Sequence, residues 1–165
     1  MPPKLRHKST MGWSLVRSLM LLSLLCLGAA ARPALAQSVS METMLGQTGY
    51  TYKTHNATTW SIELSRSNIG KTRVILSTGS DMLVTFIILA KRAAIRKTPQ
   101  LMETLVHANH DYDYAKIGLD KDGDLFVRIG TALRLLDATK LKYDIDQVAN
   151  ASNELYPKLS TWIKK

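Results

Sequence analysis

The stretch from Tyr114 to Gly130, YAKIGLDKDGDLFVRIG, constrains the fold more than any other part of the chain. Apolar and polar residues alternate on both sides of an Asp-Gly pair, which is typical of a β-hairpin. A two-residue loop at Asp122 and Gly123 would place the apolar residues of the two strands on opposite faces. A three-residue loop that starts at Lys121, with Gly123 in the left-handed region, places them on one face. The sequence therefore predicts the three-residue loop.

This register determines which side chains share a face. Its pairs are Asp120 with Asp124, Leu119 with Leu125, Gly118 with Phe126, Ile117 with Val127, and Lys116 with Arg128. The apolar face then holds Ala115, Ile117, Leu119, Leu125, Val127 and Ile129. On the other face, Phe126 is expected to cover the bare backbone of Gly118. Lys116 opposes Arg128 there, which is mildly unfavourable unless an anionic group lies nearby.

The first 36 residues have the pattern of a cleavable export signal. Residues 1–18 contain basic but no acidic residues, residues 19–31 form an apolar run of 13, and residues 34–36 have the small-x-small form of a signal-peptidase site. The apolar run is shorter than the roughly 20 residues that span a bilayer. We expect cleavage after Ala36, a periplasmic or secreted location, and no transmembrane span in the mature chain.

Residues 37–165 number 129, which is the size of one domain. The single cysteine, Cys26, lies in the predicted signal, so the mature domain has no disulfide framework and depends on a packed core. The signal also holds five of the 22 basic residues and none of the 13 acidic ones, which leaves 17 basic residues against 13 acidic. The whole-chain net charge of +9 therefore gives little support for binding to nucleic acid.

Two short segments have the signals of helices. Ser40 can cap a helix that runs through Leu45 or slightly beyond. Thr98 followed by Pro99 is a strong helix start, because proline suits the first helical position. Asn109 is the expected left-handed terminator of this second helix.

A third, longer helix is expected to begin at the cap Asp137. Its apolar residues recur at spacings of three and four as far as Trp162, which predicts one buried stripe. Pro157 lacks an amide proton, so we expect it to kink or split the helix near Tyr156.

The remaining segments predict strands. Residues 50–54, 60–65 and 73–78 alternate in polarity, as strands with one solvated face do. Residues 83–90 are apolar on both faces, which favours an interior strand that is covered on both sides or at least flanked by neighbours. A buried helix is the alternative, although the β-branched residues argue against it. With the hairpin, the order α-β-β-β-β-α-β-β-α predicts a single α+β domain, with a largely antiparallel sheet and helices packed on it.

This order and these residues resemble the YbjN-like family, whose members are labelled bacterial sensory transduction regulators. Its fold is similar to that of type III secretion chaperones. The matching features are residues 49–52 at the start of the sheet, the strand 83–90, the helix end 105–109 and the hairpin 117–128. The resemblance covers most of residues 37–165. It implies a non-enzymatic binding or regulatory domain and supplies no catalytic residues.

Two clusters could hold a metal ion. His107 and His110 are three residues apart and are followed by aspartates, but no third-ligand pattern accompanies them. Three aspartates surround the hairpin loop and could bind Ca²⁺ through oxygen, namely Asp120, Asp122 and Asp124. Here the glycine falls at the fourth position of the loop, whereas an EF-hand requires it at the sixth. We therefore predict no metal site. A metal-binding protein or enzyme that uses these groups is kept as an alternative function.

The chain has no nucleophile motif and no phosphate-binding glycine loop, so we predict no catalytic residues and no cofactor. We expect an exported, non-enzymatic protein-binding or regulatory module with a protein partner, and homodimer formation is one form of this. The candidate binding surface consists of Tyr50, Tyr52, Trp60, Phe126, Lys116 and Arg128. A further alternative is membrane-surface binding through a basic patch, consisting of Lys91, Arg92, Arg96 and Lys97 with Lys116 and Arg128. A solvated charged face is the simpler interpretation of that patch.

Overall fold

The computed structural model describes residues 40–164, so the predicted export signal, residues 1–36, lies outside the described residues. The elements, in chain order, are α2 (Met41–Thr48), β1 (Tyr52–Asn56), β2 (Thr59–Arg66), β3 (Gly70–Gly79), β4 (Met82–Ala90), η1 (Arg92–Ala94), α3 (Pro99–Asp111), β5 (Lys116–Leu119), β6 (Leu125–Ala132), η2 (Leu133–Leu135), α4 (Ala138–Leu159) and η3 (Ser160–Trp162). The predicted α+β domain and its order of helices and strands are confirmed. Within the described residues, no helix combines the length and hydrophobicity that a bilayer crossing requires.

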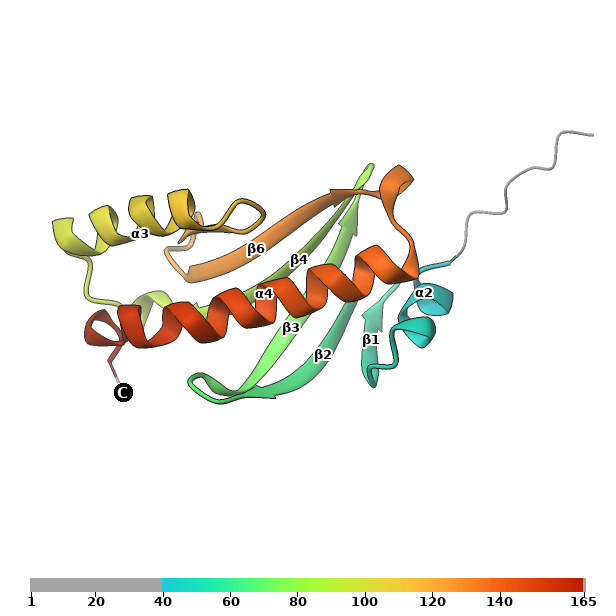
Figure 1. Cartoon of the computed structure of the whole chain (residues 1–165), viewed down its shortest axis with the longest axis horizontal. Helices are drawn as coiled ribbons and strands as arrows, with labels where there is room; N and C mark the ends of the chain where they lie inside the picture. The colour runs from blue at the N-terminus through green and yellow to red at the C-terminus, as the bar shows by residue number, and fades with distance from the viewer. Residues whose placement is uncertain (1–39, 165) are drawn as a thin grey trace, which may run out of the picture. The chain divides into compact units, whose positions relative to one another are not determined.

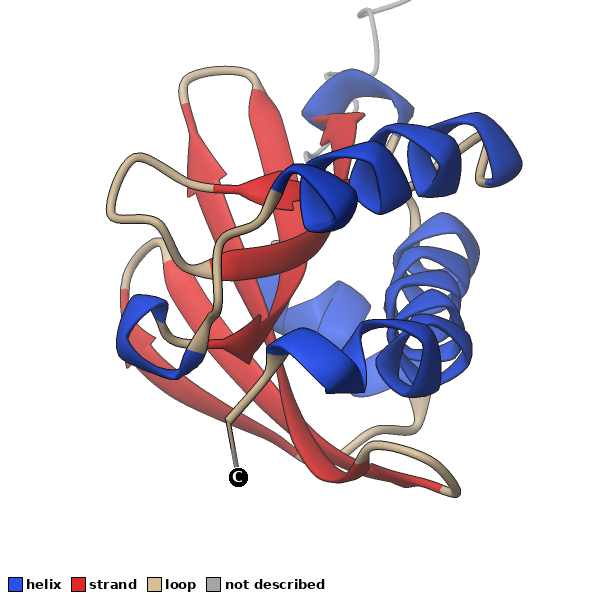
Figure 2. Ribbon diagram, turned by 90° about the vertical axis from the view of Figure 1, so that its left-hand side faces the viewer, coloured by secondary structure: helices blue, strands red, loops and turns tan. Residues whose placement is uncertain are grey.

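The six strands form one antiparallel sheet in the order β1-β2-β3-β4-β6-β5. The long helix α4 runs across one face of this sheet, with α3 beside β6 and α2 near β1 (Figure 1). Figure 2 shows the sheet from the side, with these three helices on the same side of it. We call the face that the helices cover the inner face and the opposite one the outer face.

The core lies between the inner face and α4. Alternate residues of β2, β3 and β4 are almost fully buried there, and the stripe predicted for the third helix packs against them. Its residues Leu141, Ile145, Val148, Ser152, Leu155 and Leu159 are all buried. Burying an aliphatic side chain of this size stabilises the folded state by about 1.5–3 kcal/mol. The stripe therefore holds α4 on the sheet.

The hairpin has the predicted register. Leu119 pairs with Leu125, Gly118 with Phe126, Ile117 with Val127, and Lys116 with Arg128. The loop closes through a hydrogen bond of 3.0 Å from the amide of Gly123 to the carbonyl of Asp120, and Gly123 has the expected positive φ of 84°. A Cβ on Gly118 would lie 3.6 Å from the ring of Phe126, so the ring covers the glycine backbone.

The predicted helix starts are also present. The side chains of Ser40, Thr98 and Asp137 accept hydrogen bonds from amides three residues further on, at 3.2, 3.1 and 2.7 Å. Such caps satisfy amide groups that have no partner within the helix.

The predicted end of the second helix was wrong. Helix α3 continues past Asn109 to Asp111, and Asn109 is itself helical. Its side-chain amide donates to the carbonyls of Leu105 and Ile117, at 2.8 and 2.6 Å, and its Oδ1 accepts from the amide of Ile117 at 2.9 Å. Asn109 therefore connects α3 to β5 instead of ending the helix.

Of the kink or split predicted near Tyr156, the split does not occur, because α4 continues through Pro157 to Leu159. Proline removes the amide that would normally bond to the carbonyl four residues earlier, which belongs to Asn153. That carbonyl instead accepts a hydrogen bond of 3.1 Å from Nδ2 of Asn68, in the β2–β3 turn. The turn therefore supplies the donor that proline lacks.

The first strand begins two residues later than predicted, at Tyr52 instead of Tyr50. The amide of Tyr50 donates to Oγ1 of Thr48 at 3.3 Å, so Tyr50 is held at the end of α2. At the other end, β1 continues to Asn56, which pairs with Thr59. Only residues 57 and 58 therefore separate β1 from β2. Local hydrogen bonds at both ends thus shift the strand along the sequence.

Candidate functional site on the outer sheet face

An apolar groove lies on the outer face of the sheet. Its walls are Val84, Phe86 and Ile88 of β4 and Phe126 of β6, with Asp120 and Arg128 at its rim, and its volume is about 160 Å³. We call it the outer groove and define it by these six residues. In the strand register Ile88 pairs with Phe126 and Phe86 pairs with Arg128, so the lining residues are direct neighbours.

The outer groove follows from the composition of β4. Its inner residues Leu83, Thr85 and Ile87 are buried under the helices, whereas Val84, Phe86 and Ile88 are only half-buried. Most strands place polar residues on a solvated face, but β4 is apolar on both. Because α2, α3 and α4 lie on the inner side, none of these three helices covers the outer face (Figure 2). An uncovered apolar groove is a candidate interaction site.

Two cations lie side by side at the rim of the outer groove. Lys116 pairs with Arg128 across β5 and β6, as the sequence predicts, and the Arg128 guanidinium lies 5.1 Å from the centre of the Phe126 ring. Within residues 40–164 neither cation forms an ion pair with a carboxylate. The nearby carboxylate of Asp120 instead accepts hydrogen bonds from the amides of Asp122 and Asp124, both at 2.9 Å. The rim therefore carries excess positive charge.

The basic segment before α3 contacts the acidic hairpin loop. Asp124 accepts hydrogen bonds from Nζ of Lys91 at 2.7 Å and from the amide of Arg92 at 2.8 Å. The bond from Lys91, followed by that from the Arg92 amide, lowers the pKa of Asp124, and the same contact raises the pKa of Lys91. Arg96 donates to the carbonyl of Thr161. Of the predicted basic patch, the side chains of Lys91 and Arg96 are thus engaged within the domain, whereas Arg92 contacts Asp124 through its backbone amide.

The candidate metal ligands do not converge. Among residues 40–164, no three His, Cys, Asp or Glu side chains are grouped so that they could hold a metal ion. His107 and His110 are exposed at the end of α3, and the closest acidic atom to His107 is Oε1 of Glu103, at 3.9 Å. Asp120 and Asp124 are used in hydrogen bonds within the hairpin, as described above.

The six residues of the predicted binding surface fall into separate places. Phe126, Lys116 and Arg128 lie together at the outer groove, but Trp60 does not belong to an exposed surface. It is only 2% exposed, because it points into the core, and its Nε1 donates to Glu42 at 3.2 Å.

The two tyrosines also lie away from the outer groove. Both are half-buried and pack against the core. The Tyr50 hydroxyl donates to Asp146 of α4, and Nζ of Lys142 lies 4.5 Å from the centre of its ring. Tyr50 therefore joins the segment between α2 and β1 to α4.

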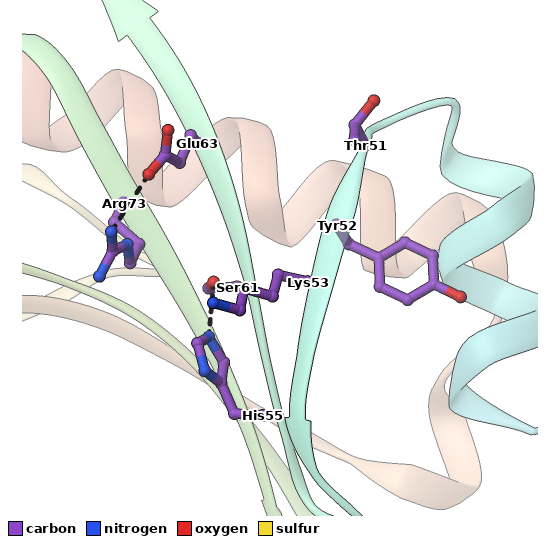
Figure 3. Close-up of a pocket in the computed structure, with 7 residues that line it drawn as sticks. All are labelled: Thr51, Tyr52, Lys53, His55, Ser61, Glu63 and Arg73. Carbon is purple, nitrogen blue, oxygen red and sulfur yellow. Dashed lines mark hydrogen bonds and ion pairs between the residues drawn. The ribbon is translucent and has the colours of Figure 1, made fainter.

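A second depression, which we call the polar pocket, lies on the outer face of β1, β2 and β3. It has a volume of about 340 Å³ and is lined by Thr51, Tyr52, Lys53, His55, Ser61, Glu63 and Arg73 (Figure 3). Nε2 of His55 lies 2.8 Å from Oγ of Ser61. Hydrogen bonds from Lys71 and then Arg73 lower the pKa of Glu63. Sequence patterns missed this site, because its residues come from three strands and a bulge lies between Thr54 and Asn56.

Comparison with known proteins identifies a family. Residues 39–161 match the YbjN family model, described as "Putative bacterial sensory transduction regulator". No curated protein matches the chain.

Three solved structures have a similar fold. YbjN from E. coli is 11% identical, with a TM-score of 0.56 over 73% of this chain and 88% of that one. A chain of the ExoU–SpcU complex of the Pseudomonas aeruginosa type III secretion system is 12% identical, with a TM-score of 0.51 over 74% and 97%. A chain of the HopA1–SchA chaperone–effector complex is 15% identical, with a TM-score of 0.51 over 71% and 93%.

Proposed function

The chain belongs to the YbjN family, and we propose on that basis that it is a non-enzymatic module that binds a segment of a partner protein in the outer groove. The observation that carries this proposal is the half-buried apolar surface of Val84, Phe86, Ile88 and Phe126 on the uncovered side of the sheet. One protein of similar fold occurs in a chaperone–effector complex. Protein binding by this fold supports the proposal for this chain.

The chemistry of the outer groove indicates the kind of partner segment. Its apolar walls suit apolar side chains, whose transfer from water is favourable by roughly 25 cal/mol for each Å² buried. Lys116 and Arg128 oppose each other at the rim, and a carboxylate placed beside them would relieve their repulsion. We therefore propose a segment that carries apolar side chains together with an aspartate or glutamate.

We also propose that the protein acts outside the cytoplasm. The support is the pattern of residues 1–36, with its basic start, apolar run and small-x-small site that ends at Ala36. Disulfides are common in exported proteins, but a domain that is stabilised by an apolar core does not need them. The lack of cysteine in residues 37–165 is therefore compatible with export.

Selection of peptides from a random displayed library tests the binding proposal. We expect the protein to enrich peptides that combine apolar residues with an acidic one. Phe86→Ser should weaken their binding by at least about tenfold, since it removes an apolar contact worth about 1.5–3 kcal/mol. Arg128→Glu should weaken it as well, while leaving the apolar walls intact. Val106→Ser is the matched control, because Val106 is 69% exposed on α3 and is not part of the outer groove.

Two results would contradict the proposal. One is enrichment of peptides whose affinity is unaffected by Phe86→Ser and Arg128→Glu. The other would come from light scattering, if the wild type were a dimer and Phe86→Ser alone among the variants were a monomer. In that case a second copy of the chain would occupy the outer groove, and the proposed partner segment would have no place there.

A further inference from the structure

We propose that the polar pocket binds an oxyanion with two negative charges, such as a phosphate group. This site is separate from the outer groove and does not depend on its function. Lys53, His55 and Ser61 line the polar pocket together with the Glu63–Arg73 pair (Figure 3). These side chains come from three adjacent strands, so the sheet holds their positions relative to one another.

The charges around the polar pocket favour an anion. Glu63 is shared by Lys71, at 2.8 Å, and by Arg73, at 3.1 Å, so one carboxylate faces two cations. Lys53 adds another cation and has no carboxylate partner within residues 40–164. The charged lining of the pocket, Lys53, Arg73 and Glu63, has a formal excess of one positive charge, and Lys71 beside Glu63 adds a second. A doubly charged oxyanion would balance that excess.

The hydrogen-bonding groups of the polar pocket also suit an oxyanion. The Lys53 ammonium has three donors and the Ser61 hydroxyl has one. When Nε2 of His55 carries a proton, it donates to the Ser61 oxygen 2.8 Å away, which leaves the Ser61 proton free to donate to a ligand. Ser61 is only 5% exposed, so its hydroxyl is held at the base of the site. Charge-assisted hydrogen bonds of this kind are stronger than neutral ones.

Other ligands fit the polar pocket less well. A metal ion would need several free carboxylates or imidazoles, but the site contains a single histidine, and the one carboxylate already faces Lys71 and Arg73. An uncharged ligand would leave the excess of positive charge unbalanced. An oxyanion is therefore the chemical class that matches both the charges and the donors.

An amide NMR titration of the protein tests this inference. The probes are inorganic phosphate, acetate and chloride, added at constant ionic strength. We expect phosphate to shift the amides of residues 53–63 with saturation in the millimolar range, acetate to bind more weakly, and chloride to have no saturable effect. Lys53→Met should weaken phosphate binding about tenfold, as expected for the loss of one charge-assisted hydrogen bond. Ser61→Ala should weaken it to a smaller extent.

Lys121→Met is the matched control, because it removes the same charge from a lysine that is 90% exposed at the hairpin loop. It should leave phosphate binding unchanged. The inference is overturned if wild-type shifts increase linearly without saturation, or if saturable shifts lie outside the polar pocket. It is also overturned if Lys53→Met and Lys121→Met weaken binding equally, because the effect would then reflect overall charge only. Each variant's spectrum shows directly whether the variant is folded.

Discussion

The side-chain amide of Asn109 is hydrogen bonded to both main-chain groups of Ile117, with Oδ1 at 2.9 Å from the nitrogen and Nδ2 at 2.6 Å from the oxygen. Asn109 belongs to α3 and Ile117 to the edge strand β5. A side chain therefore occupies the place of a neighbouring strand, and it positions the hairpin that carries Lys116 and Phe126. The same hairpin supplies Phe126 and Arg128 to the outer groove, although Asn109 lies outside it.

Asn109→Ala should destabilise the protein by about 2 kcal/mol, because it leaves the amide and the carbonyl of Ile117 without these partners. Asn109→Asp keeps the acceptor and loses the donor, so part of the stability should remain. Urea unfolding measures both effects. A loss below about 0.5 kcal/mol in the alanine variant, the level typical of neutral surface substitutions, would contradict this role.

Asn68 and Pro157 should be coupled through the carbonyl of Asn153. In the wild type, Asn68→Ala removes the side-chain donor to this carbonyl and should cost about 0.5–1 kcal/mol. In a Pro157→Ala background the new amide can donate to the same carbonyl, so the cost should be smaller. A double-mutant cycle of unfolding free energies measures this coupling. Strictly additive effects would show that Asn68 does not replace the missing proline donor.

Tyr112 should make the protein sensitive to alkaline pH. Its burial and then its hydrogen bond of 2.9 Å to Glu154 raise the pKa of Tyr112 to about 12, from 10.0. The folded state therefore keeps this proton more tightly, and the associated stability is present below pH 10 and lost between about pH 10 and 12.

Unfolding measured across that pH range tests the prediction. Tyr112→Phe should lose less stability there than the wild type, and Glu154→Gln should reduce the wild-type loss. Parallel curves for the wild type and Tyr112→Phe would rule out the predicted contribution.

Export should produce a protein that begins at Gln37. Mass spectrometry of the full chain expressed in a bacterium should detect cleavage after Ala36 and the product outside the cytoplasm. Ala36→Arg should block cleavage, since the site requires small residues. A protein that retains residues 1–36 in the cytoplasm would contradict the proposed location.

The parts of the fold that were predicted correctly have strong local signals. The register from Lys116 to Arg128 followed because only one loop length places the aliphatic residues of both strands on one face. The three helix caps followed from single residues with a known preference. These features depend on residues close together in the sequence.

The incorrect or missing predictions concern contacts between distant residues. Asparagine commonly ends helices, but the side chain of Asn109 instead accepts a hydrogen bond from the amide of Ile117 in the next strand. Pro157 did not split α4, because Asn68 supplies a donor from far away in the sequence. Trp60 was expected at the surface, yet the layer of helices covers it. Phe126 and Arg128 of the outer groove were among the predicted surface residues, but its β4 side was missed, because alternation cannot show which face of β4 the helices leave open.

Amide NMR mapping of the protein with a selected peptide tests the central proposal most directly. We expect the shifts to concentrate on residues 84–88 and 116–128, which form the outer groove and its rim, and to disappear with Phe86→Ser. Shifts confined to α2, α3 and α4, with residues 84–88 unchanged, would contradict binding on the outer face of the sheet.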